Sequence, residues 1–151
     1  MQAAILLLRR ALAADPFYAP ARAMFDFCRA LQKGRGWEAL AEAEITEALL
    51  LARRALEVGK EDPDALWMAA DTISILAHEH GVAASAIERA LKLNPNSAHA
   101  WMARGWVACC LNQPGQAIDA LTRAVRLSPP RSVRLFFPRG TCLRLPRRGA
   151  I

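Results

Sequence analysis

The amino-acid sequence predicts an all-α fold, a solenoid of paired helices with about three repeats, six helices and an irregular C-terminal tail. Two observations predict this fold. The chain is 54% hydrophobic but only 7% aromatic, and an alanine- and leucine-rich mixture of this kind favours closely packed helices over strands. Residues 64–97 also repeat at 98–131, with ten identities at a fixed offset of 34 residues. A period of that length is typical of stacked helix–turn–helix units.

The ten identities indicate how such units pack. They are Trp67/Trp101, Met68/Met102, Ala69/Ala103, Gly81/Gly115, Ala83/Ala117, Ala86/Ala120, Arg89/Arg123, Ala90/Ala124, Leu93/Leu127 and Pro95/Pro129. Two helices approach closely where small residues meet, so Gly105 is expected to face Ala117, with Trp101 and Leu121 on either side. Pro129 lacks a backbone donor and ends the last helix. The residues predicted to determine repeat packing are therefore Trp67, Ala83, Ala90, Pro95, Trp101, Gly105, Ala117, Leu121, Ala124 and Pro129.

The N-terminal part of the chain follows the same pattern less closely. A first helix is predicted over residues 2–14, and it matches the second half of a repeat, so the array opens with half a unit. The next helix, 19–32, departs from the pattern because Arg22 and Arg29 replace expected apolar residues and Asp26 replaces a small one.

A third helix is predicted from about residue 38 or 41 to Val58. The offset between Ala11 and Ala55 is 44 rather than 34, which predicts about ten inserted residues in the preceding turn. Solenoids tolerate such insertions because they enlarge a loop and leave the stacked faces in place.

The remaining helices are predicted at 62–77, 82–93, 97–111 and 115–127. Asp71 stands at the position that Gly105 holds in the next unit, which predicts a splayed helix pair there. After Pro129 the helical period ends, so residues 1–129 are expected to form the repeat domain and residues 130–151 an arginine- and proline-rich tail.

The net charge of +6 comes from the tail. Residues 129–151 contain six arginines and no acid, which leaves 14 basic and 14 acidic side chains in the rest of the chain. One expectation is that the tail contacts nucleic acid or an anionic membrane through its arginines. The other is that the tail has no partner of its own.

The cysteines favour a reducing compartment. Cys28, Cys109, Cys110 and Cys142 form no CxxC motif, as expected for free thiols. The apolar run Ile5–Leu8 is too short for a signal peptide or a membrane span. We therefore expect a cytoplasmic protein.

The repeat is identified as a tetratricopeptide (TPR) motif, and its amino-acid sequence resembles that of one group of TPR proteins. The segments that carry the resemblance are RRALAADPFYAPARAMFDFC, EALLLARRALEVGKEDPDALWMAA, NPNSAHAWMARGWV and QAIDALTRAVRLSP. Over residues 3–129 they look like the C-terminal TPR region of bacterial adenylate/guanylate cyclase-like proteins. That resemblance implies an accessory, regulatory region beside a catalytic or DNA-binding domain.

No motif predicts catalysis, a cofactor or a metal. His78-Glu79-His80 lies in a predicted turn and offers fewer ligands than a zinc site needs. Cys109 and Cys110 suit helix packing as well as redox chemistry. Gly34-Arg35-Gly36 lacks the third glycine and the preceding strand of a phosphate-binding loop.

A binding surface is the best-supported functional feature. In TPR proteins the first helix of each pair lines a concave face, and apolar residues there suit a peptide or a partner helix. The same stripe could equally be core. The predicted partner-binding residues are Phe27, Met68, Thr72, Ile75, His99, Met102, Trp106 and Cys109, with Leu31 extending the row.

The sequence thus predicts a non-enzymatic protein–protein interaction module with a protein or peptide partner. Two uncapped ends also predict a homo-oligomer, because Ile5 and Leu8 at one end and Leu121 and Val125 at the other would otherwise face water. The alternative function is contact with nucleic acid or an anionic membrane through the basic tail.

Overall fold

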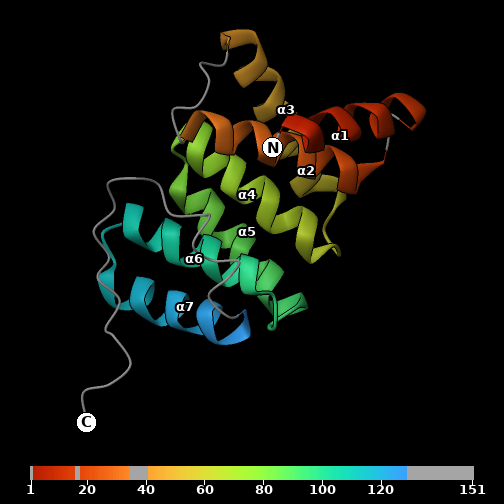
Figure 1. Ribbon diagram of the computed structural model, residues 1–151. Helices are drawn as coiled ribbons and strands as arrows, with labels where there is room; N and C mark the ends of the chain where they lie inside the picture. Colours follow the sequence, from red (N-terminus) through yellow and green to blue (C-terminus); the bar gives the residue numbers. More distant parts are fainter. Residues whose placement is uncertain (1, 16–17, 35–40, 129–151) are drawn as a thin grey trace.

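A computed structural model describes residues 2–15, 18–34 and 41–128 of the chain, and these residues form only helices and their connections (Figure 1). The all-α prediction is confirmed. The described helices are α1 (Gln2–Ala14), α2 (Ala19–Gly34), α3 (Glu42–Val58), α4 (Pro63–Ala77), α5 (His80–Leu93), α6 (Ala98–Cys110) and α7 (Pro114–Leu127). The described residues form seven helices, three pairs (α2/α3, α4/α5 and α6/α7) and the unpaired α1, so the predicted count of six was one too low although the predicted ranges include all seven. Figure 1 shows the pairs stacked in chain order from α1 to α7.

Local sequence signals explain where the central helices begin and end. Asp62 caps α4, because its carboxylate accepts hydrogen bonds from the backbone N–H groups of Asp64 and Ala65 at 2.9 and 3.2 Å, and Pro63 suits the first helical position. Ser97 caps α6 in the same way through Ala100. Before α7, Asn112 takes the left-handed conformation, with φ 56°, which asparagine tolerates better than most residues.

Two features differ from the prediction. Helix α5 begins at His80, two residues before the predicted start. The cause is His78, whose φ of 58° turns the chain so sharply that α5 starts almost immediately after α4. The insertion before α3 is partly helical: α2 and α3 have 16 and 17 residues, against 13 and 14 in α6 and α7.

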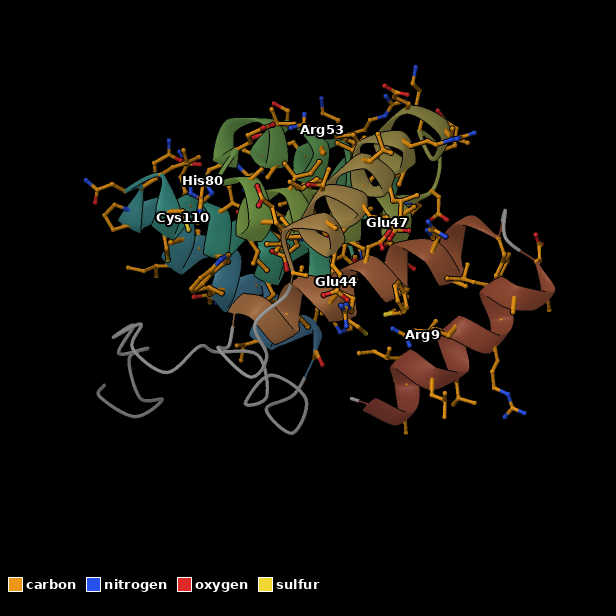
Figure 2. The ribbon with its side chains drawn as sticks, turned by 90° about the horizontal axis from the view of Figure 1, so that it is seen from above. Arg9, Glu44, Glu47, Arg53, His80 and Cys110 are labelled. Atoms are coloured by element: carbon orange, nitrogen blue, oxygen red, sulfur yellow. The ribbon has the colours of Figure 1, made fainter. Side chains whose placement is uncertain are left out.

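The arginines that break the repeat pattern in α2 join it to α3. Arg22 forms an ion pair with Glu47 at 3.4 Å, and Arg29 forms one with Glu44. Figure 2 shows Glu44 and Glu47 on the side of α3 that faces α2. Charge pairs therefore add to the apolar contact between Ala30 of α2 and Ala48 of α3 in the first helix pair.

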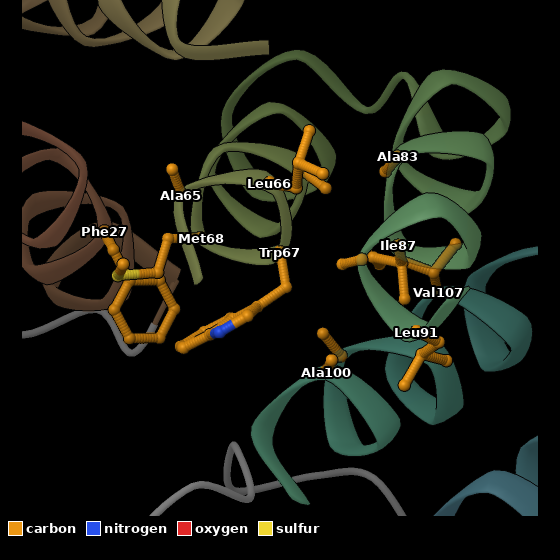
Figure 3. Packing of buried hydrophobic residues seen from close by; sticks show 13 residues of the cluster. Phe27, Ala65, Leu66, Trp67, Met68, Ala83, Ile87, Leu91, Ala100 and Val107 are labelled. Carbon is orange, nitrogen blue, oxygen red and sulfur yellow. The ribbon is translucent and has the colours of Figure 1, made fainter. Parts of the chain in front are cut away.

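The main hydrophobic core lies at the centre of the stack and joins three helix pairs (Figure 3). Phe27 of α2 meets the edge of Trp67 of α4, with ring centroids 5.0 Å apart. Ile87 of α5 is fully buried, and Val107 of α6 closes the other side. Small buried alanines allow the backbones to approach; those of this cluster are Ala65, Ala70, Ala83, Ala90, Ala100 and Ala103. The apolar side chains of each pair are thus buried from solvent by the neighbouring pairs, as in other solenoids.

Gly105 lies at a close approach of α6 and α7. A Cβ atom added there would lie 2.5 Å from Cγ of Leu121 and 3.4 Å from the backbone oxygen of Ala117. Gly105 therefore faces the residues that the spacing predicted. At the equivalent position of the preceding pair, Asp71 does not splay the helices, because Ala83 and Ile87 of α5 remain fully buried against α4.

We expect Gly105→Ala to destabilise the fold by about 1–2 kcal/mol, because overpacking costs about 1–3 kcal/mol and the gain in helix propensity is only about 1 kcal/mol. The matched control is Gly81→Ala in α5, where a new Cβ meets nothing within 4 Å; it should be neutral or slightly stabilising. Urea unfolding of both variants measures the difference. Equal stabilities for the two variants would show that Leu121 moves aside without cost.

Candidate protein-binding surface

Four predicted residues form a row along α6, which we call the α6 row: His99, Met102, Trp106 and Cys109. Their spacing of three, four and three residues places them on one helix face. His99 is exposed and the other three are half-buried, so the row is accessible on the described part of the chain. Ile75 of α4, the position equivalent to Cys109, is also half-buried.

The structure corrects the rest of the predicted concave surface. Phe27, Met68 and Thr72 are 5%, 3% and 0% exposed, so these side chains are core and cannot line an open groove. The physical reason is that α2 packs directly against α4, so that Phe27 and Met68 belong to the same core cluster. The Thr72 hydroxyl is satisfied inside the helix, since it donates to the backbone oxygen of Met68 at 2.9 Å.

The two equivalent tryptophans have different surroundings. Trp67 is 5% exposed; its ring stacks on His99 of the next pair at 5.4 Å, and its indole N–H donates to Asp64. Trp101 is half-buried, and its indole N–H donates to the backbone oxygen of Pro95. The guanidinium groups of Arg123 and Arg104 lie 5.0 and 5.9 Å from the Trp101 ring centre.

Most of the other predicted packing residues are buried. The alanines at 83, 90, 117 and 124 are buried, as are Gly105 and Leu121, whereas Pro95 is exposed. Pro129 lies outside the described residues, as does the arginine-rich tail.

The ends of the stack are less open than predicted. Ile5 is 8% exposed and Leu121 3%, because α2 covers one and α6 the other. Leu8 and Val125 are half-buried. The two most exposed leucines of α1 are instead Leu6 and Leu7.

A small pocket of about 230 Å³ lies between α5, α6 and the start of α7. Val107 and Leu111 form apolar walls, and the ion pair between Glu88 and Arg104, 3.5 Å long, spans the rim. Nothing in the 34-residue period marks this pocket, so it was not predicted from the sequence.

The histidine cluster has structural contacts. The Nδ1 atom of His80 and the buried Ser74 hydroxyl are 2.9 Å apart, and Glu79 forms an ion pair with Arg53 of α3 at 2.6 Å. Within residues 2–15, 18–34 and 41–128, no three His, Cys, Asp or Glu side chains converge as metal ligands would. Of Gly34-Arg35-Gly36, only Gly34 is described, as the last residue of α2.

The thiols are poorly suited to nucleophilic chemistry. Cys28, Cys109 and Cys110 are free, and Cys142 lies outside the described residues. Burial raises the pKa of all three thiols, and the Cys109 and Asp71 charges raise that of Cys110 further. Because the thiolate is the reactive form, a raised pKa keeps these cysteines unreactive at neutral pH.

Asp26 and Asp71 are two buried carboxyl groups whose shared raised pKa was not predicted from the sequence. Burial raises the pKa of Asp71 to about 7. Burial also raises that of Asp26 to about 7, with Glu47 adding to the effect and Arg22 opposing it. Aligning the three helix pairs places both aspartates at the position of Gly105, so the repeat register was a signal that could have found them.

The comparisons with known proteins agree with this architecture. Residues 77–132 match the family model described as tetratricopeptide repeat. Among solved structures, the crystal structure of MamA is similar, with a TM-score of 0.57 and 18% sequence identity over 83% of this chain and 67% of that one. No curated protein matches the sequence significantly. No described helix has the length and apolar character that a bilayer crossing requires. The chain therefore has an all-α helical-repeat fold of the tetratricopeptide type.

Proposed function

We propose that this chain is a non-enzymatic protein-interaction module whose binding surface is the α6 row. The observation that carries the proposal is the contrast between α4 and α6. At equivalent positions, Met68 and Thr72 are buried, whereas Met102 and Trp106 remain partly accessible. Accessible Trp and Met side chains in one row are typical of contact surfaces, because they bury a large apolar area and adapt to different partners.

The chemistry of the row favours an apolar partner segment. Met102, Trp106 and Cys109 carry no charge, and their helical spacing matches the apolar stripe of an amphipathic helix or a short extended peptide. His99 at one end is held by its stacking on Trp67. Part of the surface is thus fixed by the core, which lowers the entropic cost of binding.

The sequence resemblance of residues 3–129 supports a more specific role. We propose that the module acts as a regulatory region for a catalytic or DNA-binding domain, in the manner of the repeat regions of cyclase-like proteins. The free thiols of Cys28, Cys109 and Cys110 support a cytoplasmic location.

Photo-crosslinking of the full chain tests the α6 row. A benzoylphenylalanine at Met102 should capture a defined partner in cells, and Trp106→Ala should reduce that capture about tenfold or more, as loss of an aromatic anchor does. The control places the same cross-linker at Leu50 of α3, which is 68% exposed and lies elsewhere. Equal capture of the same proteins from both positions would exclude the α6 row as the binding surface.

A further inference from the structure

A second surface lies at the C-terminal end of the stack, which we call the end face: Trp101 of α6 with Ile118, Thr122 and Val125 of α7. The 34-residue period relates these four residues to Trp67, Ala84, Glu88 and Leu91. The contacts of the earlier set show what the end face is built to receive.

All four earlier residues are in contact with, or face, the next helix, α6. Trp67 stacks on His99, Ala84 and Glu88 border the same pocket as Val107, and Leu91 belongs to the core cluster that contains Ala100. A single helix therefore covers the face of the second pair. By the same 34-residue relation, the end face of the third pair is the position at which a further helix would pack.

The end face keeps the apolar character of the interface it repeats and lacks its acid. Ile118 replaces Ala84 and adds apolar area, whereas Thr122 replaces Glu88 and removes a carboxylate. A water-facing end would carry mainly polar side chains, but three of these four residues are apolar. Ile118 is 44% exposed, and Thr122, Val125 and Trp101 are half-buried.

The charge around the end face is net positive, because α7 carries Arg123 and Arg126 there against the single carboxylate of Asp119. In the second pair, Arg89 is neutralised by Glu61, and Glu88 receives Arg104 from α6. In the third pair, Arg123 lies over Trp101. Within the described residues, no carboxylate lies within ion-pair distance of Arg123 or Arg126.

The change at position 122 determines which charge an incoming helix should carry. Glu88 attracts the guanidinium group of Arg104, but Thr122 has no charge to attract a cation. Its hydroxyl can donate a hydrogen bond to a carboxylate, and the neighbouring arginines favour the same group. An incoming helix therefore gains from glutamate or aspartate where α6 has Arg104.

We propose that the end face binds an acidic amphipathic helix of another protein, which takes the place of a further repeat helix. This surface is separate from the α6 row. Two other occupants fit the charge less well. The chain's own residues 129–151 contain six arginines and no acid, and α1 of a second copy has two arginines and no acid. Either segment would bring like charges to Arg123 and Arg126.

The probe for this site can be taken from the chain itself. It is a fluorescent peptide of residues 96–112 with Arg104 replaced by glutamate and both cysteines replaced by serine. The control peptide keeps Arg104. Titrated with the full chain and followed by fluorescence anisotropy, the glutamate peptide should bind at least tenfold more tightly than the arginine peptide. Binding should weaken as salt is added.

Two variants locate the binding. Ile118→Asp should weaken binding of the glutamate peptide at least tenfold. Val82→Asp, a matched change at an exposed residue of α5 (46% exposed), should leave it unchanged. Circular dichroism verifies that both variants are folded, and Ile118→Ala gives a milder version of the same test. Equal binding of the two peptides, or unchanged binding by Ile118→Asp, overturns the proposal.

A benzoylphenylalanine at position 118 of the full chain distinguishes the occupants. Cross-linking to the glutamate peptide, read by mass spectrometry, supports the proposal. Cross-linking to residues 129–151 of the same chain, or to a second copy, in the presence of saturating peptide overturns it.

Discussion

Trp67→Ala is expected to destabilise the fold by about 3–5 kcal/mol, the usual cost of removing a large buried aromatic side chain. Three contacts are lost together: the edge contact with Phe27 of α2, the stacking on His99 of α6 and the hydrogen bond to Asp64. Because these contacts join three successive helix pairs, the loss should lower the cooperativity of unfolding as well as the midpoint. Urea denaturation followed by circular dichroism measures both.

Trp101→Ala is the matched control, since it removes the same residue type from the equivalent position of the next repeat. Trp101 is half-buried and has arginine side chains over its ring instead of aromatic neighbours from two other helix pairs. We therefore expect a loss of about 1–2 kcal/mol. If Trp67→Ala is too unstable to study, Trp67→Phe keeps part of the ring and should fall between the two. Equal losses at both tryptophans would contradict the assignment of Trp67 as the central contact.

The sequence was a good guide to the fold because the repeat period is a direct consequence of helix packing. The 34-residue period predicted that Gly105 faces Ala117, with Leu121 beside the contact; in the structure a Cβ atom at Gly105 would meet Leu121 first, at 2.5 Å, and the backbone oxygen of Ala117 at 3.4 Å. The starts of α4 and α6 were predicted within one residue, because the caps at Asp62 and Ser97 depend on local chemistry alone. The start of α5 was predicted two residues late, because it depends on the left-handed conformation of His78, which is uncommon for any residue other than glycine.

The binding surface was harder to predict for a related reason. A repeat period equates positions such as Met68 and Met102, but it does not say which neighbouring helix covers each of them. Coverage depends on how closely α2 packs against α4, and the insertion before α3 changes the period at that point. The sequence predicted a continuous row, but its accessible residues are those of α6 together with Ile75 of α4.

The buried carboxyl group of Asp71 gives the second large expected effect, a dependence of stability on pH. Its pKa in the folded state is about 7, raised by burial from an ordinary value of 3.8. The protonated form is therefore favoured by folding. The cost of Asp71 disappears as the pH falls below its ordinary pKa of 3.8, where the carboxyl group is neutral in both states. Its cost grows as the pH rises towards 7 and is constant above that.

We expect Asp71→Asn to stabilise the fold at pH 8 by on the order of 2–4 kcal/mol, because asparagine keeps the shape of the side chain and removes the ionisation. At pH 4 the variant and the natural chain should be about equally stable. Urea unfolding at pH 4, 6 and 8 measures the difference, and this difference should increase with pH. Asp119→Asn on the exposed side of α7 is the control and should show no such trend. A stability gain that is the same at pH 4 and pH 8 would show that Asp71 does not bind its proton more tightly in the folded chain. In that case the side chains at the equivalent position of the three pairs, Asp26, Asp71 and Gly105, would differ in size but not in proton binding.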